Sequence, residues 1–188
     1  EFQNILISKS KSIKFNDINI YNNTIGSSFL LLTDCIEILF NNLSLQNSSI
    51  LYRNLNYFGS IDITNVQNLT FQNSLISLNI MTEIPLIVME GIKYLNILNL
   101  TAKNNILFST ENENFCSLFI INCHNNECTN HNLKNSTFID NEAINGIPLL
   151  FSNHLIDFES VILNNNTGKY KSFSYFIFAK ESILLKLV

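Results

Sequence analysis

The feature that most constrains how this chain can fold is a segment that recurs six times along its 188 residues. Each copy alternates apolar and polar residues and ends near an asparagine, and a polar patch and a second apolar run follow it. The copies cover 12–23, 35–47, 65–73, 91–104, 132–141 and 154–166, and the apolar runs cover 27–32, 59–64, 84–89, 117–121, 147–151 and 174–179. A recurring period of this length indicates a solenoid.

Alternation with a period of two, in segments rich in Ile, Leu, Phe and Val, predicts strands rather than helices. The chain has three alanines, so no segment offers a run of strong helix formers. Two or three short strands per repeat, separated by Asn-rich turns, can stack as coils about 4.8 Å apart. We therefore expect an all-β fold, a parallel β-helix of about six to seven coils, with 1–188 forming one segment.

Two other folds fit the repeat less well. A leucine-rich-repeat solenoid is suggested by 18–25 and 92–100, but Ser48, Ser74 and Lys103 stand where that repeat needs asparagine. The segments between the copies also resemble strands. A β-sandwich of irregular hairpins is the third option.

One asparagine in each copy serves as an anchor for the repeat. The anchors are separated by 24, 26, 31, 37 and 24 residues, and they are Asn23, Asn47, Asn73, Asn104, Asn141 and Asn165. In stacked coils, equivalent amide side chains can hydrogen-bond along the stack, and an inward-facing ladder satisfies buried polar atoms. We expect these anchors to form such a ladder. The alternative is that asparagine occurs at these turns by chance, because it makes up 32 of the 188 residues.

Charge and hydropathy argue against two classes of partner. Charged residues make up 14 % of the chain, the net charge is −4, and Arg53 is the single arginine, so no basic surface for nucleic acid is expected. No apolar run reaches the roughly 18 residues of a membrane span, so this segment is not expected to insert into a membrane. The bias toward asparagine and isoleucine suits an AT-rich genome, as in many protists.

The segment NSTFIDNEAINGIPLLF (135–151) resembles the repeats of polymorphic outer-membrane proteins and their eukaryotic relatives. In that family an F-x-x-N element precedes a glycine and an apolar strand, and 18–32 and 161–176 are similar. The matching residues are Phe138, Asn141, Gly146 and Ile147, then Ile20, Asn23 and Gly26, then Ile162, Asn165 and Gly168. The resemblance implies a right-handed β-helix of the pectin-lyase-like class, on large surface or secreted proteins that are often adhesive and non-catalytic.

The same fold class includes polysaccharide lyases and hydrolases, which need converging acidic residues. Here Asp17, Asp62, Asp140 and Asp157 occur singly, one per repeat. We therefore expect no catalytic residue, cofactor or metal, and a carbohydrate-active enzyme is the alternative function.

Cysteine and histidine gather between residues 115 and 132. The residues are Cys116, Cys123, His124, Cys128 and His131, and their spacing matches no common zinc signature. A disulfide is favoured, either Cys123–Cys128 or Cys116–Cys128, with free thiols or zinc as alternatives. Cys35 is expected to be a small buried side chain, and His154 to cap a turn.

Seven N-x-[ST] sequons are present, at Asn22, Asn42, Asn47, Asn68, Asn99, Asn135 and Asn165. We expect Asn22, Asn68, Asn99 and Asn135 to be exposed and able to carry N-linked glycans. With the cysteines and the resemblance, this predicts an extracellular or cell-surface location reached through the secretory pathway.

These observations predict a non-catalytic structural or adhesive segment of a larger protein. Both ends of the sequence are strand-like, so further coils of the parent chain or neighbouring subunits are the expected partners at the open sheet edges. Lateral assembly into a fibre or coat is a further option, and a horseshoe-shaped recognition module is a third functional reading.

Overall fold

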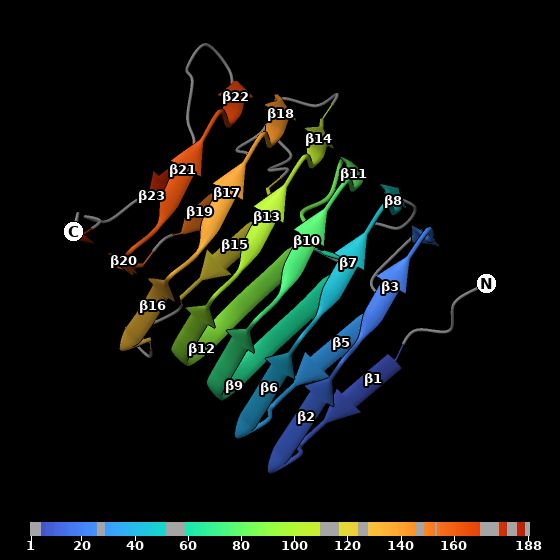
Figure 1. Cartoon of the computed structure of the whole chain (residues 1–188). Coiled ribbons are helices and arrows are strands. Elements are labelled where there is room, and N and C mark those ends of the chain that lie inside the picture. The colour runs from blue at the N-terminus through green and yellow to red at the C-terminus, as the bar shows by residue number, and fades with distance from the viewer. Residues whose placement is uncertain are drawn as a thin grey trace.

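The computed structural model describes residues 5–25, 29–51, 59–109, 117–123, 128–145, 149–152, 154–169, 177–179 and 184–186. Every regular element in these ranges is a β-strand, and every strand pair is parallel (Figure 1). The prediction of an all-β fold with parallel strands is therefore confirmed. The parallel pairing does not fit a sandwich of antiparallel hairpins, and the several strands per repeat do not fit the horseshoe.

The strands form three sheets, called A, B and C. The first row of sheet A is β1 (Ile5–Ser8), β5 (Leu30–Thr33), β9 (Ile61–Gln72), β12 (Ile87–Leu98), β15 (Phe119–Asn122), β19 (Leu150–Ser152) and β23 (Ile177–Ala179). Its second row is β2 (Ser12–Asn16), β6 (Glu37–Asn41), the later halves of β9 and β12, β16 (Asn130–Lys134), β20 (Asp157–Glu159) and β24 (Leu184–Lys186).

Sheet B is β3 (Asn19–Tyr21), β7 (Ser44–Gln46), β10 (Leu75–Ser77), β13 (Thr101–Lys103), β17 (Thr137–Ile139) and β21 (Ile162–Asn164). Sheet C is β4 (Thr24–Ile25), β8 (Ser49–Leu51), β11 (Ile80–Thr82), β14 (Ile106–Phe108), β18 (Glu142–Ile144) and β22 (Thr167–Lys169). A full repeat therefore contributes to both rows of sheet A, then to B and to C. This makes three strands, as predicted, where β9 or β12 runs through both rows, and four, one more than the predicted two or three, where the rows are separate strands.

Each strand pairs with its equivalent in the next repeat, so the repeats stack in register. Equivalent residues are 25, 31, 26, 36 and 25 positions apart from one end of the stack to the other. The described residues of the predicted apolar runs lie on, or directly before, the first row of sheet A. Five of the six predicted copies of the motif, in contrast, contain parts of two strands, such as β2 and β3, because a left-handed residue divides them, whereas 65–73 contains only the later part of β9.

Left-handed residues make the corners between the sheets. Among the described residues, non-glycine residues with φ near +50 to +60° recur at equivalent places, and thirteen of these seventeen are Asn or Asp. These two side chains tolerate that backbone region better than other non-glycine residues do. At the bend between the two rows of sheet A, Asn65 (φ 54°) and Gly91 (φ 63°) take the same role inside β9 and β12. The corners therefore explain much of the asparagine content.

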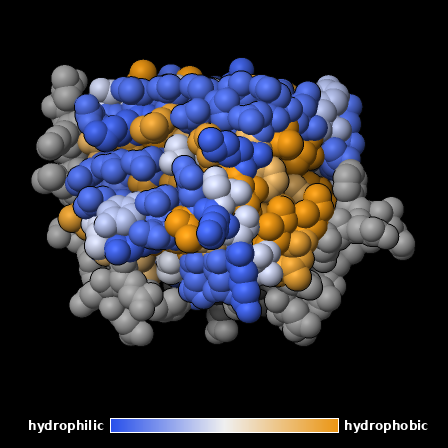
Figure 2. Space-filling view, turned by 90° about the horizontal axis from the view of Figure 1, so that it is seen from below, coloured by the Kyte–Doolittle hydropathy of each residue, from blue (hydrophilic) through white to orange (hydrophobic). Residues whose placement is uncertain are grey.

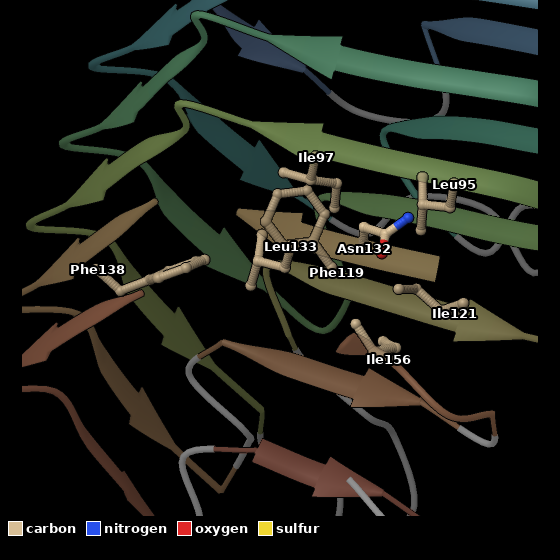
Figure 3. A pocket seen from close by; sticks show the side chains of 8 residues that line it. All are labelled: Leu95, Ile97, Phe119, Ile121, Asn132, Leu133, Phe138 and Ile156. Atoms are coloured by element: carbon tan, nitrogen blue, oxygen red, sulfur yellow. The ribbon is translucent and has the colours of Figure 1, made fainter. Parts of the chain in front are cut away.

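The interior is apolar and built from columns of equivalent residues. Phe15, Phe40 and Phe71 stack face to face with successive ring centroids 4.7 Å apart. The column continues with the smaller Ile97 and then Leu133. An apolar cavity of about 10 Å³ lies beside these two smaller residues. Figure 3 shows the side chains that line it, namely Leu95, Ile97, Phe119, Ile121, Asn132, Leu133, Phe138 and Ile156. The cavity is too small for an organic ligand and marks a site of imperfect packing.

Leu78 is a corner residue that departs from the Asn/Asp preference. It has φ +57°, its side chain is 52 % exposed, and Asn47 and Asn104 stand at the equivalent corner of the neighbouring repeats. We expect Leu78→Asn to raise the free energy of unfolding by about 1 kcal/mol, because leucine is strained in this backbone region. Urea unfolding monitored by circular dichroism measures the change. The control is Ile80→Asn, at a similarly exposed strand position, which should not stabilise; loss of stability in Leu78→Asn would contradict the corner argument.

Candidate functional site

Four asparagine side chains form a buried row at the corner between sheets B and C. Asn79, Asn105 and Asn141 have no exposed surface and Asn166 is 6 % exposed. Each one follows directly after the left-handed corner residue of its repeat. The row is thus fixed by the corner, which turns the next side chain inward.

The buried amides satisfy each other and the backbone. Nδ2 of Asn79 donates to Oδ1 of Asn105 at 3.0 Å and to the carbonyl of Leu45 at 2.9 Å. The backbone N–H of Asn79 donates to the same Oδ1 at 3.1 Å. Asn105 repeats this pattern toward Asn141, and Asn141 repeats it toward Asn166. Polar groups that would be costly to bury therefore have partners at every step.

The predicted ladder differs from the observed one by one residue at several anchors. Asn141 lies in the buried row, and the half-buried Asn23 is in register at its first step, where its N–H donates to Oγ of Ser48 at 3.4 Å. Asn47, Asn104 and Asn165 are instead the exposed left-handed residues that precede the row, and Asn73 lies at the corner between sheets A and B. Where two asparagines are adjacent, as at 104–105 and 165–166, the first makes the corner and the second fills the interior.

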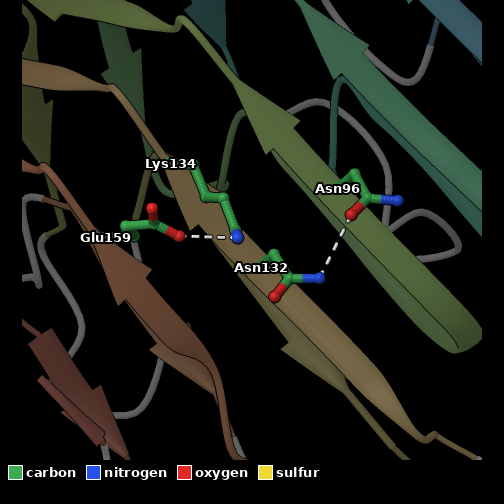
Figure 4. Close-up of polar contacts among 4 residues, drawn as sticks. All are labelled: Asn96, Asn132, Lys134 and Glu159. Atoms are coloured by element: carbon green, nitrogen blue, oxygen red, sulfur yellow. Dashed lines mark hydrogen bonds and ion pairs between the residues drawn. The ribbon is translucent and has the colours of Figure 1, made fainter. Parts of the chain in front are cut away.

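Exposed amides form further, outer rows. Nδ2 of Asn165 donates to Asp140 at 2.6 Å, Nδ2 of Asn99 donates to Asn73 at 3.0 Å, and Asn47 donates to Asn22. On sheet A, Nδ2 of Asn132 donates to Oδ1 of Asn96 at 3.1 Å (Figure 4). Nearby, Nζ of Lys134 lies 2.6 Å from Oε2 of Glu159. The corner pairs are exposed and the pairs on sheet A are half-buried, so each contributes about 1 kcal/mol or less.

The four predicted glycosylation candidates are all exposed. Asn22, Asn99 and Asn135 are left-handed corner residues, and Asn68 lies in β9. Asn42, Asn47 and Asn165 are also corners, so six of the seven sequons share one structural origin. In these six sequons the corner asparagine is followed by an inward-facing residue and then by a Ser or Thr that begins a strand. This order matches N-x-[ST]. One face of the molecule, seen in Figure 2, is largely hydrophilic with apolar residues gathered in a smaller area.

A disulfide joins Cys123 to Cys128, with the two Cα atoms 5.9 Å apart. Cys116 and His124 lie outside the described residues. The paired strands end with Glu90 opposite Asn122 and resume with Tyr94 opposite Asn130. Counting on from these pairs, Cys123 corresponds to Gly91 and Cys128 to Ile92. Gly91 and Ile92 are adjacent, whereas 124–127 separate the two cysteines. The disulfide therefore joins two positions that are neighbours in the preceding repeat and closes a four-residue insertion, and closing such a loop contributes about 2 kcal/mol.

His131 is a buried polar residue in an otherwise apolar column. It is in register with Leu95, which pairs in turn with Leu69 and then Ile38. It is 2 % exposed, and its Nε2 lies 2.8 Å from the carbonyl oxygen of Ile92. Nδ1 has no hydrogen-bond partner within the described part of the chain. Burial lowers the pKa of His131; the hydrogen bond to the Ile92 carbonyl opposes this, and the nearby His154 adds to the lowering.

Other predicted residues fall at separate places. Cys35 is a buried free thiol, and Sγ donates to the carbonyl of Thr33 at 3.2 Å. His154 belongs to a local turn, in which its N–H donates to Oγ of Ser152 at 3.1 Å, and its ring meets that of His131 edge-on at 5.0 Å. The acids Asp17 and Asp140 lie at two different corners, and Asp157 begins β20. Arg53 lies outside the described residues.

Comparisons with protein-family models, with curated proteins and with solved structures found no match for this chain. Within the described ranges, no helix has the length and hydropathy that a bilayer span requires.

Replacing one buried amide tests the importance of the row. We expect Asn105→Leu to lower the free energy of unfolding by about 2–4 kcal/mol, because it removes the acceptor of the Asn79 N–H and the donor to the Ile76 carbonyl. Urea unfolding measures the loss. The matched control is Asn104→Ala, one residue earlier and exposed, where only the corner preference is lost, at about 1 kcal/mol. Equal losses of unfolding free energy in the two variants would show that the buried hydrogen bonds do not contribute more to stability than the exposed corner does.

The lowered pKa of His131 predicts a pH dependence of stability. As pH falls below about 6.5, His131 binds a proton in the unfolded chain but remains neutral in the folded chain. The stability that this residue contributes above that pH is therefore lost. The slope from this one group cannot exceed about 1.4 kcal/mol per pH unit. We expect His131→Leu to be less sensitive to pH than the parent chain in urea unfolding between about pH 7.5 and pH 5. Parallel pH profiles for both chains would contradict the assignment.

Proposed function

We propose that this chain is a segment of a right-handed parallel β-helix, related to the repeats of polymorphic outer-membrane proteins and the pectin-lyase-like class. In this proposal it is a non-catalytic structural or adhesive part of a large secreted or cell-surface protein. Sheets A, B and C would be the faces of the helix, and each repeat would be one coil. The observation that carries the proposal is the in-register parallel stack with satisfied amides at its buried corner.

A rigid element is what this arrangement supports physically. Every backbone hydrogen bond of a strand connects two repeats, and the buried amides add side-chain bonds in the same direction. Bending the stack would break bonds at several corners together. On the outside, equivalent Asn, Ser and Thr residues recur at about 4.8 Å intervals. Such a regular polar surface suits repeated weak contacts with a neighbouring protein or glycan.

The disulfide and the sequons support an extracellular location. Disulfides persist in oxidising compartments, and Cys123–Cys128 closes a corner of the fold. The candidates Asn22, Asn68, Asn99 and Asn135 are exposed, as a glycosylated asparagine must be.

The alternative, a carbohydrate-active enzyme, needs two carboxyl groups facing each other across a substrate site. Asp17 accepts a hydrogen bond from Asn42 at 2.8 Å, and Asp140 accepts one from Asn165 at 2.6 Å. These two acids thus pair with amides at different corners. No feature of the described residues favours this alternative over the structural role.

We expect an antibody raised against the folded chain to label intact cells of the source organism, because the segment is proposed to face outward. We also expect chain purified from those cells to lose mass on treatment with an N-glycosidase. Site mapping by mass spectrometry should find glycan at one or more of Asn22, Asn68, Asn99 and Asn135. The control is an antibody to a cytosolic protein, which should require permeabilised cells. Labelling only after permeabilisation, with no change in mass, would overturn the proposed location.

A further inference from the structure

The corner closed by Cys123 and Cys128 also contains a group of side chains that could bind a metal ion. The sulfur atoms of these cysteines and one ring nitrogen of His131 lie within 4.8 Å of one another. Two sulfurs and an imidazole nitrogen are the donors that zinc-type cations prefer in proteins. The disulfide uses both sulfurs in its oxidised form, so a cation can use them only after reduction.

His131 supplies the independent indication that this corner can bind a ligand. A carbonyl oxygen can only accept, so the 2.8 Å contact with the Ile92 carbonyl places the ring proton on Nε2. Nδ1 then carries the lone pair, and it is buried without a hydrogen-bond partner in the described residues. Metal-binding histidines commonly have this arrangement, in which the second nitrogen donates to a backbone carbonyl and fixes the tautomer.

The position of His131 makes its identity significant. Its equivalents Ile38, Leu69 and Leu95 are apolar and fully buried. A histidine with an unused nitrogen is costly in such a column unless a ligand uses it. The cost occurs in the repeat that also carries both cysteines.

We propose that, once the Cys123–Cys128 disulfide is reduced, the two thiolates and Nδ1 of His131 bind one zinc-type divalent cation at this corner. A trialkylphosphine reductant supplies two electrons, the Sγ–Sγ bond breaks, and the phosphine becomes its oxide with an oxygen from water. The two protons of that water go to the sulfurs. The cation then displaces both thiol protons into solvent. The two thiolates, the neutral imidazole and the 2+ ion together carry no net charge.

The geometry of the corner accommodates both states. A tetrahedral ion with bonds of about 2.3 Å to sulfur needs the two sulfurs about 3.8 Å apart. The Cα atoms are already 5.9 Å apart, so side-chain rotation provides this separation. Zinc takes a fourth ligand, for which His154 is the candidate and water the alternative, since the His154 ring centroid lies 5.0 Å from that of His131. Disulfide and cation would each hold the insertion closed, one under oxidising and one under reducing conditions.

The test uses the 188-residue chain, reduced with the phosphine and titrated anaerobically with Co²⁺ and then Zn²⁺. We expect one Co²⁺ per reduced chain, with thiolate-to-cobalt absorption that Zn²⁺ abolishes, and no such absorption for the oxidised chain. Cys123→Ser/Cys128→Ser should abolish binding. His131→Asn should weaken it by more than about 100-fold, since losing even an outer-shell partner costs 10–100-fold. His154→Ala distinguishes the fourth ligand: unchanged affinity assigns water, and weaker binding assigns His154.

The matched control is Cys35→Ser/Cys116→Ser, which keeps the proposed ligands and should bind like the parent. Loss of binding in this control, or full binding by Cys123→Ser/Cys128→Ser, would overturn the assignment. Circular dichroism checks that each reduced variant is folded. As a second measurement on the parent chain, Zn²⁺ should slow alkylation of Cys123 and Cys128, mapped by mass spectrometry; equal rates with and without Zn²⁺ would also overturn it. The proposal does not depend on the extracellular role proposed above.

Discussion

The backbone hydrogen bonds of each strand run to the repeats before and after it, and the rest of the structure depends on this constraint. A single repeat has no partner for its own N–H and C=O groups, so it cannot be a stable unit. Stability comes from adding layers in register. In-register stacking also brings like side chains together, which is why Phe15, Phe40 and Phe71 form one stack and Asn79, Asn105 and Asn141 form one row.

Corners are the second constraint. The chain must turn sharply between sheets, and a left-handed residue provides the turn without glycine. Because the residue after the corner points inward, the two positions need opposite properties. The first needs tolerance of positive φ, and the second needs burial with every polar atom bonded. Asparagine meets both needs, so the adjacent pairs at 104–105 and 165–166 follow from the fold and not from composition alone.

Much of the fold could be predicted because period-two alternation reports directly which residues face inward. The parallel strands and the placement of the apolar runs in sheet A followed from that pattern. The register did not, because neighbouring asparagines look alike in a sequence and the insertion at 124–127 changes the spacing. Asn73 falls at a different corner because the corner between sheets B and C in its repeat carries Leu78 in place of asparagine. The special place of His131 was also missed, although alignment with Leu95, Leu69 and Ile38 would have revealed a histidine among aliphatic residues.

The insertion between Cys123 and Cys128 leaves the pairing intact on both sides, from Glu90 with Asn122 to Tyr94 with Asn130. Strand length is thus fixed by the stack, whereas length at a corner is free to vary. A scaffold with this property can acquire foreign peptide at its bends without rebuilding its interior. The bends can therefore differ in length and sequence from one repeat to the next, while the strands beneath them keep the same register.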